Sequence, residues 1–158
     1  MDYYFFNTDV SCLDGKSRVG VLIKKGIAAT SGERSYGEQL GMAFQIVDDI
    51  LDFTATSEEL GKPAGSDLLA GTVTLPTLLY MERSPENNPV RRAFDGVRRK
   101  ANLQRAIDEI RASDLLEESM VTARRFADRA LEALAELPPG DPRNHLEALV
   151  EYVLTRRS

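Results

Sequence analysis

Hydrophobic residues recur at helical spacing along most of the chain after residue 33. Residues 35–53 contain no proline and few polar positions, a pattern that predicts a long buried helix. Residues 114–137 place apolar side chains three and four positions apart, which predicts an amphipathic helix. Shorter stretches of the same kind predict helices at 75–81, at 90–100, at 102–111 and from Asp141 to about Arg156.

Clusters of glycine, proline and polar residues separate these predicted helices. They occupy residues 54–74, 84–89 and 138–140. Asp114, with Glu117 three residues later, predicts the N-cap of the helix that follows. The chain is therefore expected to alternate helices with short connections.

The first part of the chain has no single interpretation. Residues 19–23 and 26–29 fit a strand and a helix equally well. No pair of strands is evident after residue 33. The sequence therefore predicts an all-α helical domain at residues 33–158, preceded by an uncertain segment, 1–32, that is either remodelled or unrelated to that domain.

The composition excludes several classes of protein. The chain has 158 residues, 42% of them hydrophobic, with one cysteine and one histidine, which excludes disulfide scaffolds and zinc fingers. The net charge of −5 at pH 7 argues against a general nucleic-acid binder. No stretch approaches the roughly 18–20 apolar residues of a membrane span, and the start does not resemble a secretory signal. We therefore expect a cytoplasmic protein without a transmembrane segment.

The predicted helix at 35–53 carries a narrow acidic face made of Gln45, Asp48, Asp49 and Asp52. At about 100° per residue, these four positions fall within a sector of about 100°. Apolar residues cover the rest of the helix, so the helix is expected to be buried, and three neighbouring carboxylates repel one another. Cations would relieve this repulsion, and Mg²⁺ commonly joins carboxylates to substrate phosphates. The alternative is a solvated acidic face on a surface helix.

Basic residues elsewhere in the chain allow two interpretations. Lys62 lies on a glycine-flanked loop soon after the acidic face, where an ammonium beside Mg²⁺ would neutralise a diphosphate. The alternative is a solvated charge. The run of basic residues within 91–100 is interpreted as a solvated helix face rather than an anion site. Arg156 and Arg157 have two explanations: a basic C-terminus can fold over a diphosphate site, and a helix C-terminus favours arginine in any case, so neither residue is included among the candidate site residues.

Three segments together resemble the trans-isoprenyl (polyprenyl) diphosphate synthases. Residues 36–52 contain Phe-Gln-x-x-Asp-Asp-x-x-Asp, which is similar to the second aspartate-rich motif of that family. Residues 61–68, Gly-Lys-Pro-Ala-Gly-Ser-Asp-Leu, and residues 74–76, Thr-Leu-Pro, resemble the segment that follows it. Residues 133–138 and 149–157 are also similar to the last helices of the family, so the resemblance covers about residue 33 onward. It implies the C-terminal half of an all-α bundle of the isoprenoid synthase type, built around a central cavity.

The resemblance also implies an activity and a set of site residues. The family condenses an allylic diphosphate with isopentenyl diphosphate, with Mg²⁺ as cofactor. The implied roles are metal binding for Asp48 and Asp52 with Asp49 beside them, substrate orientation for Gln45, cavity lining for Phe44, and clamping of the allylic diphosphate for Lys62.

Two departures from the family pattern lead to alternative hypotheses. The chain has no Asp-Asp-x-x-Asp motif upstream of the acidic face, and Thr72 stands where the family has a second diphosphate lysine. Lys16, followed by Ser17, corresponds to the family's Lys-Thr pair and its substrate-binding lysine, although the spacing to Gly37 is several residues short. We expect a prenyltransferase half that works as a homo-oligomer or with a partner chain supplying the first motif. The alternative is a non-catalytic interaction subunit or inactive relic. A terpene cyclase fits less well, because its second motif is of the Asn-Ser-Glu type.

Overall fold

The computed structural model describes residues 31–54, 63–135 and 137–156, and every regular element among them is a helix. No strand occurs in these ranges, so the predicted all-α class is confirmed. In chain order the helices are α2 (Ser31–Thr54), α4 (Ser66–Ala70), α5 (Leu75–Arg83), α6 (Pro89–Phe94), α7 (Arg99–Arg111), α8 (Leu115–Leu134) and α9 (Asp141–Thr155).

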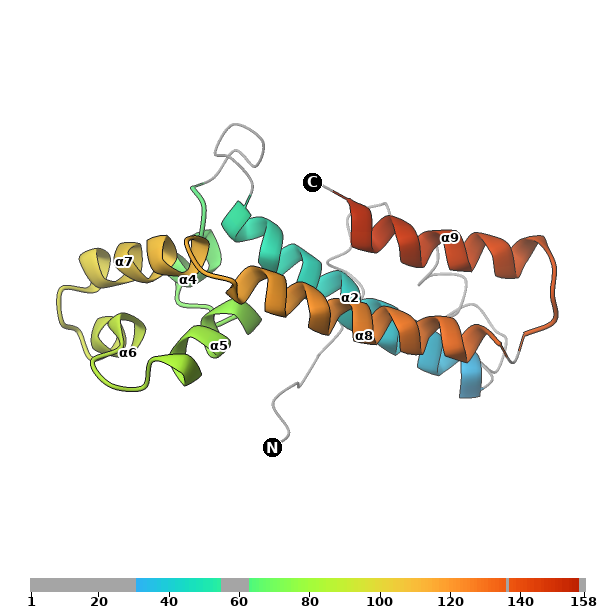
Figure 1. Cartoon of the computed structure of the whole chain (residues 1–158), viewed down its shortest axis with the longest axis horizontal. Coiled ribbons are helices and arrows are strands. Elements are labelled where there is room, and N and C mark those ends of the chain that lie inside the picture. Colours follow the sequence, from blue (N-terminus) through green and yellow to red (C-terminus); the bar gives the residue numbers. More distant parts are fainter. Residues whose placement is uncertain (1–30, 55–62, 136, 157–158) are drawn as a thin grey trace.

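The three longest helices lie side by side and the four short ones gather at one end (Figure 1). α8 runs antiparallel to both α2 and α9, whereas α2 and α9 run in the same direction (Figure 1). Two contacts hold the parallel pair in register. The Tyr36 hydroxyl donates to the Leu146 carbonyl at 2.9 Å, and Arg156 donates to the Phe44 carbonyl at 3.0 Å. The C-terminal end of α9 therefore lies beside the middle of α2.

Small residues on α8 allow α2 to pack closely against it. Ala123, Ala127 and Ala130 are at most 1% exposed and are spaced three or four positions apart, so they form one face. The opposing side of α2 contributes buried apolar residues, including Ala43 and Val47. This contact places the remaining side of α2, with its acidic residues, toward α4, α5 and the end of α9.

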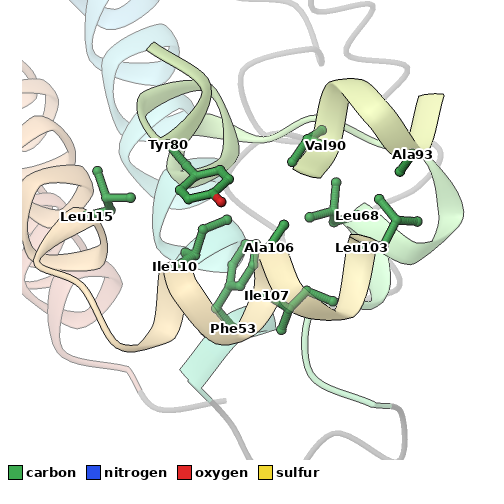
Figure 2. Packing of buried hydrophobic residues seen from close by; sticks show 10 residues of the cluster. All are labelled: Phe53, Leu68, Tyr80, Val90, Ala93, Leu103, Ala106, Ile107, Ile110 and Leu115. Carbon is green, nitrogen blue, oxygen red and sulfur yellow. The ribbon is translucent and has the colours of Figure 1, made fainter. Parts of the chain in front are cut away.

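A second core holds the short helices together. It consists of buried side chains from α4, α5, α6 and α7 with one residue each from α2 and α8 (Figure 2). Phe53 at the end of α2 is fully buried in it, and Leu115 at the start of α8 is 2% exposed. The end of α2 is therefore fixed by packing, directly after the acidic positions.

Two boundaries differ from the sequence predictions. The segment predicted as a loop at 54–74 contains the short helix α4. The single helix predicted at 90–100 is wrong: α6 ends at Phe94 and α7 begins at Arg99. The chain turns between them, where Gly96 has φ 82° and Arg98 has φ 42°, both incompatible with a continuous right-handed helix. The basic residues of this region consequently lie on two helices and a turn.

The predicted cap at Asp114 is also different. Asp114 occupies the N-cap position of α8, but its side chain makes no capping hydrogen bond. Instead it pairs with Arg83 at the end of α5, and the Ser113 hydroxyl accepts from the Leu115 N–H at 3.3 Å. The carboxylate therefore joins α5 to α8 rather than capping its own helix.

Three expectations concern residues 1–30 and 55–62. The interpretations of residues 1–30, Lys16 and Lys62 lie outside the described residues. Within the described ranges, no helix combines the length and the apolar character needed to cross a membrane.

Candidate functional site

The acidic face of α2 (Gln45, Asp48, Asp49 and Asp52) runs from the protein interior to the surface. Asp49 is 7% exposed and Asp52 is 4% exposed. The Asp48 side chain, in contrast, is 43% exposed. The helix and the clustering of these positions on one face are as the sequence predicts, but each carboxylate has a different environment.

Asp49 is a buried acid whose proton affinity is raised. Gln45 Nε2 donates to Asp49 Oδ1 at 2.9 Å, one helical turn away. Burial raises the pKa of Asp49 to about 6, and the hydrogen bond from Gln45 partly opposes that rise. The nearby Asp67 and Asp48 also raise this pKa, while the Leu75 N–H lowers it. A cation placed here would therefore favour the charged form of Asp49 and lower its pKa.

Asp52 holds the start of α4. Its Oδ1 accepts from the Ser66 hydroxyl at 2.6 Å and its Oδ2 accepts from the Asp67 N–H at 3.1 Å. Its carbonyl accepts from the Gly65 N–H at 2.7 Å. The side chain thus satisfies donors in the first turn of α4, in the way an N-cap residue does. Asp52 has a structural function in addition to the one that the motif implies.

Gly65 makes this connection possible. Its φ of 71° lies in the left-handed region, and a Cβ there would stand 2.6 Å from both Cγ1 and Cδ1 of Ile107. Ile107 is 1% exposed and belongs to the core of the short helices. Glycine is therefore required for the chain to turn from the loop into α4 against α7.

Asp48 is paired with the end of the last helix. Arg156 Nη2 donates to Asp48 Oδ1 at 2.5 Å, and the guanidinium carbon lies 3.8 Å from the centroid of the Phe44 ring. Phe44 is half-buried and packs against the core between α2, α8 and α9. Sequence reasoning left Arg156 out of the site. The available signal was an arginine directly after an apolar helix, which a helix C-terminus explains equally well.

The described carboxylates fit a divalent cation only in an open arrangement. Within the described residues, no group of three or more His, Cys, Asp or Glu side chains is close enough to form a closed metal cage. Mg²⁺ does not need such a cage, because it is usually held by one or two carboxylates with substrate phosphates and water. Asp48 is the exposed hard-oxygen donor, with Asp49 next to it, so the donor set fits Mg²⁺ in that form.

Comparisons with known proteins identify the family and agree with the fold. The sequence profile described as polyprenyl synthetase matches residues 17–110. The heptaprenyl diphosphate synthase component 2 of Bacillus subtilis is 40% identical over 122 residues, covering 77% of this chain and 35% of the relative. The mitochondrial hexaprenyl pyrophosphate synthase of Saccharomyces cerevisiae is 34% identical over 162 residues, covering 99% of this chain and 34% of the relative.

Solved structures agree. The heptaprenyl diphosphate synthase of Staphylococcus aureus aligns with a TM-score of 0.72 and 37% identity, over 80% of this chain and 40% of that one. A polyprenyl synthase of Caulobacter crescentus, in complex with calcium and isoprenyl diphosphate, aligns with a TM-score of 0.69 and 40% identity over the same shares. The chain therefore spans about a third to two-fifths of the length of these relatives.

Proposed function

The chain belongs to the polyprenyl synthetase family, and on that premise we propose that it supplies the second aspartate-rich half of a Mg²⁺-dependent prenyltransferase site. The observation that carries this proposal is the acidic face of α2, which grades from the buried Asp52 to the exposed Asp48. The relative in complex with calcium and isoprenyl diphosphate supports a divalent cation and a diphosphate as the ligands.

The proposed reaction joins an allylic diphosphate to isopentenyl diphosphate. The C–O bond of the allylic diphosphate breaks and its electron pair stays with the diphosphate; the isopentenyl double bond attacks the allylic carbon, and a proton is lost. When bound, Mg²⁺ neutralises the charge that develops on the departing diphosphate.

The residues of this chain would prepare the site for that charge. Asp48 is the exposed carboxylate for the cation, and Asp49 stands beside it, held by Gln45. Asp52 fixes the start of α4, which follows Lys62 in the sequence. Phe44 contributes an apolar ring one turn before Asp48, where it would line the wall for the hydrocarbon. We assign Lys62 to the diphosphate because an ammonium there complements the metal.

The remaining half of the site must come from another polypeptide segment. We infer that the Asp-Asp-x-x-Asp motif is supplied by a further part of the same protein, by a second copy or by a partner chain. Two relatives are named as component 2 of a heptaprenyl diphosphate synthase, which supports a heteromeric assembly. Lys16 would add a substrate-binding lysine.

A prenyl-transfer assay tests this function. The chain is combined with Mg²⁺, an allylic diphosphate, labelled isopentenyl diphosphate and candidate chains that carry Asp-Asp-x-x-Asp. Product is expected with a suitable second chain and is expected to fall at least 100-fold in Asp48→Ala. Asp128→Ala, at an exposed position on α8, is the matched control and should keep full activity. Failure with every second chain would refute the catalytic proposal.

Two observations favour a non-catalytic function. Asp52 is held by Ser66 and Asp67 in a way that stabilises the fold without any ligand, and Thr72 replaces a family lysine. An interaction subunit would keep these contacts but bind no Mg²⁺–diphosphate. Calorimetric titration with Mg²⁺ and inorganic pyrophosphate distinguishes the two functions, since only the catalytic half should bind them.

A further inference from the structure

The side chain of Arg156 lies against one turn of α2. Its Nη2 donates both to Asp48 Oδ1 at 2.5 Å and to the Phe44 carbonyl at 3.0 Å. The same guanidinium covers the Phe44 ring, 3.8 Å from its centroid. Phe44 and Asp48 are four residues apart, so all three contacts fall on one turn of α2, at the edge of the acidic face. Within the described residues, no other side chain forms a hydrogen bond with the Asp48 carboxylate.

The two partners differ in burial. The Arg156 side chain is 8% exposed, whereas the Asp48 side chain is 43% exposed. Arg156 Nε is buried and has no hydrogen-bond partner among the described residues. A buried guanidinium depends on its counter-charge, because arginine does not lose its proton in proteins. The pair is therefore unlike a surface salt bridge, in which both side chains are hydrated.

The position of Arg156 is set by the packing of α9. Val150 and Val153 are at most 2% exposed and anchor the last turns of the helix on α2 and α8. The Arg156 N–H still bonds to the Tyr152 carbonyl at 3.0 Å, but its ψ of 149° takes the chain out of the helix. The side chain thus projects from a fixed helix end toward the acidic face.

We propose that Arg156 is the resident counter-ion of Asp48 and competes with the divalent cation for that carboxylate. The inference rests on the proposed function, in which Asp48 is a metal ligand. A guanidinium on Oδ1 holds the carboxylate in position and repels a second cation. Since coupling between two sites is reciprocal, cation binding at Asp48 releases Arg156 and loosens the end of α9, and removal of Arg156 tightens cation binding.

Mn²⁺ binding, followed by electron paramagnetic resonance of the free ion, tests this competition on the full chain. Arg156→Gln is expected to bind Mn²⁺ about fivefold more tightly than the wild type, at the lower end of typical coupling between sites. Arg156→Lys keeps the charge and should stay within about twofold of the wild type. Arg143→Gln is the matched control, because Arg143 lies on the same helix and pairs with Glu147 at 2.8 Å, away from the acidic face. Loss of a merely structural contact would not tighten metal binding.

Amide hydrogen exchange at residues 150–156 provides a second readout. In the wild type, Mn²⁺ should speed exchange at the end of α9. In Arg156→Gln, exchange should already be fast and should not respond to Mn²⁺. If Arg156→Gln does not fold, Asp48→Asn serves in its place, because removing the anion should also release the end of α9.

The outcomes separate this inference from the function on which it rests. In one outcome, Asp48→Asn abolishes Mn²⁺ binding while Arg156→Gln leaves it unchanged or weakens it. That result would overturn the competition between Arg156 and the cation but would not contradict the proposed function. Absence of Mn²⁺ binding in the wild type and all variants would overturn the competition between Arg156 and the cation, whereas the proposed function is overturned by failure of the prenyl-transfer assay with every second chain. Tighter binding in Arg156→Gln together with a Mn²⁺-dependent loosening of α9 supports both.

Discussion

The Ser66 hydroxyl donates a 2.6 Å hydrogen bond to Asp52 Oδ1, so the last carboxylate of the acidic face also holds the first turn of α4. The same carboxylate accepts from the Asp67 N–H at 3.1 Å. The acidic face of α2 therefore has a more exposed carboxylate at Asp48 and, at its other end, a buried carboxylate at Asp52 that stabilises the fold. Substitutions at the two ends should have different consequences for stability and for ligand binding.

Removal of the Ser66 hydroxyl tests the structural end. Ser66→Ala should lower the free energy of unfolding by about 1–2 kcal/mol, because a buried carboxylate loses one of its donors. Urea denaturation followed by circular dichroism measures the change. Thr122→Ala is the control, since its hydroxyl bonds only within α8 and its loss should change stability by less than about 0.5 kcal/mol. Equal effects of the two substitutions would contradict the account of Asp52.

Asp49→Asn should stabilise the chain at neutral pH in the absence of divalent cations. Burial raises the pKa of Asp49 to about 6 in the folded chain, above its ordinary value of 3.8, so the folded state binds the extra proton between about pH 4 and pH 6. The contribution of this group to stability is therefore complete below about pH 4 and is lost as the pH rises through 6. Asparagine keeps an acceptor for Gln45 without the charge, and we expect a gain of about 1–2 kcal/mol at pH 7.

The pH dependence isolates this group from the other carboxylates. The difference in unfolding free energy between Asp49→Asn and the wild type should be near zero at pH 4 and should grow until about pH 7. Urea denaturation at several pH values, in the presence of a chelator, measures it. A difference that is constant across this range would show that the Asp49 charge is not disfavoured by burial.

Gly65→Ala tests the turn into α4. The positive φ of Gly65 and the 2.6 Å approach of a Cβ to Ile107 should together lower the unfolding free energy by about 2–4 kcal/mol. Gly96→Ala is the matched control, because Gly96 has a similar φ of 82° and a Cβ there meets nothing within 4 Å. The control should lose only about 1 kcal/mol, from backbone strain. Thermal or urea denaturation compares the two, and equal losses would refute the close contact with Ile107.

Tyr36→Phe tests the register between α2 and α9. The variant loses the hydrogen bond from the Tyr36 hydroxyl to the Leu146 carbonyl, and we expect a loss of about 1 kcal/mol in unfolding free energy. Burial raises the pKa of Tyr36 to about 12, so its phenol should also stay un-ionised in an absorbance titration at pH 11. Tyr152→Phe is the control, since Tyr152 is 60% exposed and should tolerate the change. Ionisation of Tyr36 near pH 10, seen as the difference between the titrations of the wild type and Tyr36→Phe, would contradict its burial.

The helices and the acidic face could be predicted because both depend on local spacing. Gln45, Asp48, Asp49 and Asp52 share a face of any helix that contains them, and an otherwise apolar helix must be buried. The resemblance of this segment to one family then predicted the ligands, Mg²⁺ and a diphosphate. The match of residues 17–110 to the polyprenyl synthetase profile confirms that recognition.

The contacts of Asp48 could not be predicted in the same way. Arg156 reaches Asp48 across 108 residues of sequence, and that contact depends on the register of α9 on α2. The register is set by buried side chains such as Val150 and by Tyr36, whose pairing with Leu146 no local pattern encodes. The sequence predicts one helix across the break between α6 and α7. Arg98 adopts a left-handed backbone conformation there, which is uncommon for arginine and is not indicated by the residue type.

Calorimetric titration of the chain with an allylic diphosphate in the presence of Mg²⁺ tests the central claim most directly. If α2 carries half of a metal–diphosphate site, the wild type should bind and Asp48→Ala should weaken binding at least tenfold, while Asp128→Ala binds like the wild type. Mg²⁺-independent binding, or equal binding by the wild type and Asp48→Ala, would contradict the account.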